Sequence, residues 1–184
     1  AISFAQSRFS GSCLIADIGT GSGAIAVSLA VHLPQATVFA TDSSPDALEV
    51  AAINCRRHGV EGRVTLLLGD NVSPLPEPVH ILVANLPYIK DDDLVRLSPE
   101  IRFWEPLEAL RGGRDGLDKI RHFLSRAGDR IRPEGLILLE MSPEQREALV
   151  QVARHHFPGA RIEVTRDLAG LERVLVIDLG SISL

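Results

Sequence analysis

Near its amino end the chain reads Leu14-Ile15-Ala16-Asp17-Ile18-Gly19-Thr20-Gly21-Ser22-Gly23-Ala24, an apolar run followed by a turn with glycine at alternate positions. Glycine tolerates positive φ and lets a ligand or another segment approach the backbone closely. A helix-like segment, residues 24–33, follows the turn. A strand, a glycine-rich turn and a helix in this order are typical of the start of an open α/β sheet, whose ligands bind at the carboxyl ends of its strands.

Outward from this turn, apolar runs alternate with helix-length segments. Seven strands are expected, at Leu14–Ile18, Thr37–Thr41, Val64–Leu68, Val79–Ala84, Leu136–Met141, Ile162–Thr165 and Val174–Leu179. Helices are expected at Ala24–Leu33, Pro45–His58, Leu117–Ile131 and Pro143–His155. This alternation predicts a mostly parallel, doubly wound sheet, buried on both faces. The last two strands are separated only by residues 166–173, so we expect the final strand to be antiparallel to its neighbour.

The composition is that of one globular α/β domain covering residues 1–184. The chain is 45% hydrophobic, and it has neither an apolar stretch of the roughly 20 residues that a membrane helix needs nor a basic signal-peptide start. We therefore expect a cytoplasmic protein that does not bind membranes. A formal charge of −5 disfavours broad nucleic-acid binding. Cys13 and Cys55 lack metal-ligand spacing, so we expect reduced, buried thiols and no metal.

One segment, residues 89–116, interrupts the alternation with about 30 residues of mixed charge that contain Gly112-Gly113. Connections of this length are usually functional or disordered. The segment leaves the carboxyl end of the fourth expected strand, which favours a cover over an active site. A tolerated surface insertion is the alternative.

The glycine turn fits two kinds of cofactor. Read as GxGxxA, with Asp42 at about the right distance for a ribose, it loosely matches a dinucleotide fingerprint. The carboxylate of Asp17 would repel a pyrophosphate, whereas S-adenosylmethionine carries an ammonium and a sulfonium and no phosphate, so we favour this methyl donor. Asp42 could accept from both ribose hydroxyls or cap the next helix, as Ser43 and Ser44 also could. Asp70 is a candidate acceptor for the adenine amino group and Asn71 a neighbour of the ring, although a plain turn also explains Asn71.

Asn85-Leu86-Pro87-Tyr88 follows the fourth expected strand and indicates a planar nitrogen as methyl acceptor. The lone pair of an amide or exocyclic amine is delocalised, so such a nitrogen attacks a methyl group only when it is held and polarised. The Asn85 oxygen and a neighbouring backbone carbonyl can accept both N–H bonds. The face of Tyr88 can stack on the planar group.

Over nearly its whole length the chain resembles the methyltransferase domain of the HemK/PrmC protein-glutamine methyltransferases. The resemblance rests on residues 17–26, Asp42 with residues 44–48, Gly69-Asp70, residues 85–89, Ile101-Arg102, Glu105-Pro106-Leu107, residues 112–117 and residues 166–170. It implies a Rossmann-like class I methyltransferase fold and transfer of a methyl group to the glutamine of a Gly-Gly-Gln loop in peptide chain release factors. It also implies that residues 89–116 form a substrate loop.

The resemblance implies roles for individual residues as well. Donor contacts would come from Asp17, Gly19, Thr20, Gly21, Ser22, Gly23 and Asn85, with Asp42 at the ribose and Asp70 and Asn71 near the adenine. Asn85, Leu86, Pro87 and Tyr88 would hold the acceptor glutamine, and Asn85, Pro87 and Tyr88 are the expected catalytic residues.

The chain departs from the family pattern at three places. Leu86 stands where the family usually has the first proline, so the backbone carbonyl is kept while some stiffness is lost. Asn71 stands where an apolar or aromatic residue is common, and the N-terminal helical domain of the family is expected to be absent. Two further readings remain open: an adenine or guanine amino methyltransferase acting on a nucleic acid, and a non-catalytic S-adenosylmethionine-binding module. Nothing in the sequence indicates an oligomeric state.

Overall fold

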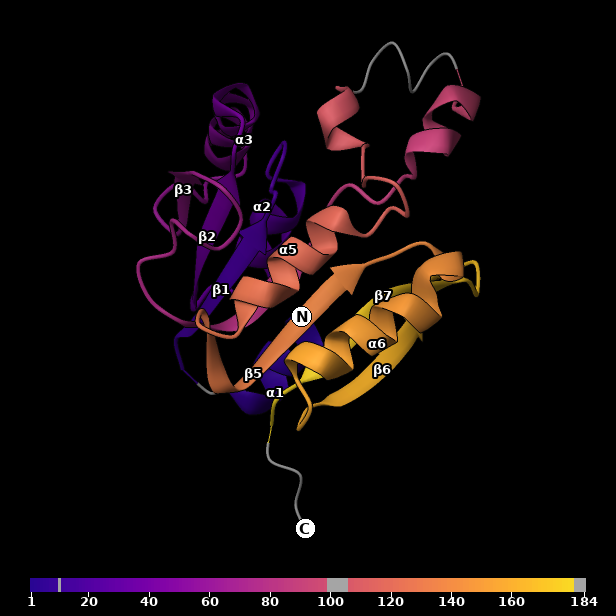
Figure 1. Ribbon diagram of the computed structural model, residues 1–184. Coiled ribbons are helices and arrows are strands. Elements are labelled where there is room, and N and C mark those ends of the chain that lie inside the picture. Colours follow the sequence, from indigo (N-terminus) through magenta and orange to yellow (C-terminus); the bar gives the residue numbers. More distant parts are fainter. Residues whose placement is uncertain (10, 99–105, 181–184) are drawn as a thin grey trace.

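The computed structural model describes residues 1–9, 11–98 and 106–180, which are built around a seven-stranded sheet (Figure 1). The strands are β1 (Cys13–Ile18), β2 (Ala36–Asp42), β3 (Val64–Leu68), β4 (Val79–Ala84), β5 (Ile131–Glu140), β6 (Arg161–Arg166) and β7 (Glu172–Asp178). Their spatial order is β3-β2-β1-β4-β5-β7-β6, and the first five strands of this order run parallel. β7 is antiparallel to both β5 and β6. The predicted mixed, doubly wound sheet is confirmed.

Helices cover both faces of the sheet. They are α1 (Ile2–Arg8), α2 (Ala24–His32), α3 (Pro45–Arg57), α5 (Asp118–Ala127) and α6 (Arg146–His156), with 3₁₀ turns η1 (Asp91–Arg96), η2 (Leu107–Ala109) and η3 (Pro143–Gln145). Side chains of β1 alternate between the two faces: Ala16 and Ile18 join the core beneath α5 and α6, while Cys13 and Ile15 join the core beneath α1 and α2. This period of two buries both faces of the strand, as a covered parallel sheet requires.

Two predicted helix boundaries were wrong. The helix expected at Leu117–Ile131 is α5, which ends at Ala127, because residues 128–130 form a turn and Ile131 already pairs with Val79 at the start of β5. The helix expected from Pro143 begins as the 3₁₀ turn η3 and becomes α-helical at Arg146. In both places a local turn interrupts a helical sequence pattern.

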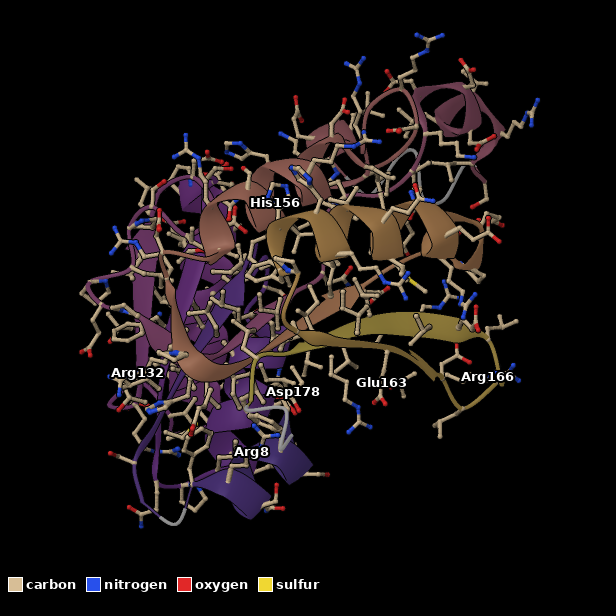
Figure 2. All side chains as sticks on the ribbon, turned by 60° about the horizontal axis from the view of Figure 1, so that its bottom comes forward. Arg8, Arg132, His156, Glu163, Arg166 and Asp178 are labelled. Carbon is tan, nitrogen blue, oxygen red and sulfur yellow. The ribbon has the colours of Figure 1, made fainter. Side chains whose placement is uncertain are left out.

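α1 was not predicted. It lies near the amino edge of the sheet, and Figure 2 shows Arg8 at its end directed toward Asp178 at the end of β7, with 2.8 Å between Arg8 Nη2 and Asp178 Oδ2. The next residue, Phe9, packs its ring against that of His80, with centroids 4.5 Å apart. Cys13 and Cys55 are both free and buried, as predicted. No helix in the described part of the chain is long and apolar enough to cross a membrane.

Candidate active site

A cavity of about 740 Å³ opens at the carboxyl ends of β1 to β4. Its wall joins the glycine turn after β1, the end of β2, the turn after β3 and the segment after β4, and thus most of the residues predicted for the site. A second depression, of about 570 Å³, lies between α5 and α6. None of these four segments lines it, and it shares only His122 of α5 with the first cavity. The first cavity is therefore the candidate active site.

Asp17 lies behind the glycine turn and is not part of the cavity wall. Its side chain is 1% exposed, and Oδ2 accepts from Thr20 Oγ1 at 2.6 Å and from the Ala26 amide at 3.0 Å. Oδ1 is buried without a hydrogen-bond partner in the described residues. Burial is the largest effect and raises the pKa of Asp17 to about 6. The two hydrogen bonds lower this pKa, and the nearby Asp42 charge raises it, but both effects are smaller than that of burial. The structure thus places Asp17 where it braces the turn.

Three glycines in the turn have positive φ: 68° at Gly19, 55° at Gly21 and 79° at Gly23. A Cβ on Gly21 would meet nothing within 4 Å, so this residue faces open space in the cavity wall. Gly23 instead packs closely on α3, because a Cβ there would lie 3.0 Å from Ala51 Cβ. Gly23 is outside the cavity wall, whereas Gly19, Thr20, Gly21 and Ser22 line it.

Asp42 ties the end of β2 to the glycine turn. Its Oδ2 accepts from the Gly21 amide at 2.8 Å, and its Oδ1 accepts from the Ser44 amide at 2.9 Å. The cap of α3 is Ser44, whose Oγ accepts from the Ala47 amide, so Asp42 is not needed for capping. Each carboxylate oxygen keeps a second lone pair that can face the cavity.

The turn after β3 brings Asp70 and Asn71 to the cavity. Asn71 has φ of 56°, and its Oδ1 accepts from the amide of Val72, so its side chain serves the turn itself. Asp70 Oδ2 lies 2.8 Å from His122 Nε2 of α5, and both side chains are partly exposed. Sequence reasoning missed His122 and Lys119, which line the cavity from the first turns of α5. Their spacing of three residues on a helix that follows the long loop is the signal that could have found them.

The segment after β4 supplies Asn85, Leu86 and Pro87 to the cavity wall, and Tyr88 lies beyond it. The hydroxyl of Tyr88 donates to Glu140 Oε1, with 3.3 Å between the oxygens. Burial, together with the charge of Glu140, raises the pKa of Tyr88 above its ordinary value. Glu140, at the end of β5, thereby orients the ring.

The described parts of the long connection, residues 89–98 and 106–116, return to the site. Pro106, Glu108 and Ala109 line the cavity. The amide of Ile89 donates to the Leu110 carbonyl at 3.1 Å, and the amide of Gly112 donates to the Ile89 carbonyl at 2.8 Å. Ile101-Arg102 and Glu105, which contribute to the resemblance to the methyltransferase family, lie outside the described residues. In the described part of the chain, no three His, Cys, Asp or Glu side chains are grouped to hold a metal.

Comparisons with known proteins found similar sequences. A family model described as "Methyltransferase domain" matches residues 15–104. A release factor glutamine methyltransferase of Gloeobacter violaceus is 44% identical over 163 residues, and one of Moorella thermoacetica is 48% identical over 160 residues. The chain belongs to the family of these methyltransferases. The two matches cover 88% and 86% of the chain, which spans 57% and 56% of the two relatives' own lengths.

Solved structures of other methyltransferases share the fold of this family member. The ribosomal protein L11 methylase of Lactobacillus delbrueckii superimposes with a TM-score of 0.67 at 17% identity, covering 96% of this chain and 74% of that one. TrmN of Thermus thermophilus gives a TM-score of 0.65 at 21% identity, covering 96% and 47%. At these identities the similarity concerns the fold alone, and it is that of class I methyltransferases.

Proposed function

We propose that this domain transfers a methyl group from S-adenosylmethionine to the side-chain amide nitrogen of the glutamine in the Gly-Gly-Gln loop of a peptide chain release factor. The observation that carries the proposal is that the glycine turn, residues 19–22, and the segment Asn85-Leu86-Pro87 line one cavity. Donor and acceptor sites are thus adjacent. The sequence relatives of the same family are named for this activity.

Two features of the cavity support binding of this donor. Gly21 leaves open space where a side chain would stand, and Asp42 and Asp70 place carboxylates along the wall. When bound, S-adenosylmethionine supplies an electrophilic methyl group on a sulfonium. We assign the ribose hydroxyls to Asp42, the adenine amino group to Asp70, and the methionine end to the turn at residues 19–22. Asp17 supports that turn from behind.

The acceptor side has two oxygens for one amide group. The side-chain oxygen of Asn85 and the backbone carbonyl of Leu86 would accept the two N–H bonds of the glutamine amide. These bonds orient the nitrogen toward the donor and stabilise the positive charge that develops on it as the new N–C bond forms. The nitrogen then loses one proton to water. Most of the rate enhancement comes from orientation, since effective molarities reach on the order of 10⁵ to 10⁸ M in such arrangements.

Tyr88 and the long connection complete the proposed acceptor site. We assign stacking on the planar amide to the Tyr88 ring, whose hydroxyl donates to Glu140 just beyond the cavity wall. Residues 106–109 would contact the peptide on either side of the glutamine. We propose residues 1–184 as one catalytic domain with a substrate loop near residues 89–116. With a translation factor as its partner, the domain would act in the cytoplasm.

The experiment is methylation of a Gly-Gly-Gln peptide and of an intact release factor, read by mass spectrometry. We expect one added methyl mass on the glutamine, and none when that glutamine is replaced by asparagine. Asn85→Ala should lower kcat by roughly 10² to 10³, as does removal of one group that stabilises developing charge elsewhere. Gln35→Ala, at an exposed position in the turn before β2, is the control and should retain full activity.

Two other results would replace the proposal. Methylation of RNA or DNA with no methylation of either protein substrate would indicate a nucleic-acid amino methyltransferase. Tight donor binding by calorimetry without product from any of these acceptors would indicate a binding module.

A further inference from the structure

Gln145 is a buried polar residue outside the cavity wall. It ends the 3₁₀ turn η3, and it is 4% exposed. Burying an amide side chain costs free energy unless its donors and acceptor are hydrogen-bonded. The partners of Gln145 therefore indicate what the residue does.

The side chain joins three segments that are distant in sequence. Its Nε2 donates to the Tyr88 carbonyl at 3.0 Å and to the Gly116 carbonyl at 3.1 Å. Its Oε1 accepts from the Ser142 amide at 3.2 Å, which completes a capping box at the start of η3. Both N–H groups of the amide thus hold the Tyr88 and Gly116 carbonyls, while the oxygen accepts the bond that caps η3.

The backbone around the Tyr88 carbonyl leaves no room for side chains. Gly116 has φ of 78°, and a Cβ on it would collide with the Tyr88 oxygen and with Gln145 Nε2. A Cβ on Gly112 would lie 2.8 Å from the Tyr88 carbonyl carbon. The glycines of residues 112–116 therefore let the end of the long connection close directly on the Tyr88 peptide.

The residues after Tyr88 also contact the returning end of the long connection. Ile89 exchanges backbone hydrogen bonds with Leu110 and Gly112, and the Asp91 amide donates to the Gly113 carbonyl at 3.1 Å. The outgoing and returning legs of the connection are thus held together beside Tyr88. Gln145 fastens this junction to the turn that follows β5, and the Tyr88–Glu140 contact is a second link, to the end of β5 itself.

We propose that Gln145 is a positioning residue for the methyl transfer: by fixing the Tyr88 carbonyl against Gly116, it aims the segment Asn85–Tyr88 at the acceptor amide. This inference rests on the function proposed above. A displacement of about 1 Å at an acceptor-holding group can lower kcat about 10²-fold, although the residue that moved touches neither substrate.

The cap and the positioning role can be separated by one substitution. Gln145→Glu keeps an oxygen for the Ser142 amide, and glutamate serves a capping box as well as glutamine does. It loses both donors and sets a carboxylate against two carbonyls. Gln145→Leu removes donors and acceptor together. Gln151→Glu makes the same chemical change at an exposed position of α6 and is the matched control.

The test measures kcat and KM with the Gly-Gly-Gln peptide, donor Kd by calorimetry, and hydrogen exchange of single amides, at temperatures where each variant is folded. For Gln145→Glu we expect kcat to fall at least about tenfold, with donor Kd within about twofold of wild type. The amides of Ile89 and Gly112 should exchange faster. Gln151→Glu should change none of these quantities.

Two outcomes would overturn the inference. One is a folded Gln145→Glu with wild-type kcat and KM while the wild-type protein methylates the peptide, which would leave the proposed function intact and reduce Gln145 to a cap. The other is unchanged exchange at Ile89 and Gly112. If the wild-type protein methylates no peptide, the proposed function fails, and the exchange rates alone decide whether Gln145 holds the junction.

Discussion

The side chain of Leu86 lies against Gly19, so that a Cβ built on Gly19 would be 3.0 Å from Leu86 Cδ2. This contact joins the end of β4 to the turn after β1, and hence the proposed acceptor side of the cavity to the proposed donor side. Because Gly19 has φ of 68°, a side chain there is strained even without the contact. The two residues should therefore be coupled energetically.

A double-mutant cycle on this pair tests the coupling. We expect Gly19→Ala to weaken donor binding by at least about tenfold, since it combines backbone strain with displacement of Leu86. In the Leu86→Ala background the same change should cost less, by about 0.5 kcal/mol or more. Donor Kd from calorimetry on the four proteins gives the interaction energy, and strictly additive effects would mean that the contact does not matter.

The buried carboxyl of Asp17 predicts a pH dependence of stability. Its pKa is raised to about 6, mainly by burial, from an ordinary value near 3.8. The folded state therefore binds this proton more tightly than the unfolded state does, and the contribution of Asp17 to stability falls as the pH rises from about 4 to about 6 and is constant above. The expected loss is on the order of 2 to 3 kcal/mol.

Asp17→Asn isolates this effect from the other carboxylates. The amide oxygen can accept from Thr20 and Ala26, as Oδ2 does, and no charge is buried. Urea denaturation at pH 5 and pH 8 should show the variant gaining stability relative to wild type at the higher pH. A difference that is the same at both values would contradict the raised pKa.

Asp42 should matter for donor binding through the backbone as well as through the ribose. Asp42→Ala leaves the amides of Gly21 and Ser44 without their acceptor, and hydrogen bonds to a charged group are worth about 1.5 to 3 kcal/mol. We expect donor Kd to rise at least about tenfold, because 1.4 kcal/mol is one factor of ten. Glu49→Ala, at an exposed position of α3, should leave Kd unchanged.

The contact between Asp70 and His122 predicts competition with the donor. Because both side chains are substantially exposed, the pair should contribute less than about 1 kcal/mol to stability. His122→Ala frees Asp70, so donor binding should become tighter by a few-fold with little change in Tm. His155→Ala on α6 is the control. Weaker donor binding in His122→Ala would show instead that the imidazole contacts the donor.

Local patterns predicted much of the fold. The apolar runs located all seven strands, and the short gap between the last two led to the correct antiparallel β7. The helix end at Ala127 was missed because the residues that follow look helical until Ile131 pairs with Val79. α1 was missed because it is short, and its contacts, such as Arg8 with Asp178, come from the far end of the chain.

The candidate site also has residues that local patterns could locate and others that they could not. The glycine turn, Asp42 and the Asn85 segment could be found from sequence because each lies at or directly after the end of a strand. Parallel strands bring their carboxyl ends to one edge. The place of Asp17 behind the turn could not be found, since a motif does not say which way a side chain faces.

For this protein, residue order alone determined the strand–turn–helix succession and which residues lie at the carboxyl edge of the sheet, because hydrophobic period and glycine conformation act over a few residues. Only the tertiary structure decided which side chains meet across that edge. Gln145 and Tyr88 are 57 positions apart, and Asp70 and His122 are 52 apart. Such contacts depend on how α5 and the turn after β5 pack on the sheet, which no short stretch of sequence encodes.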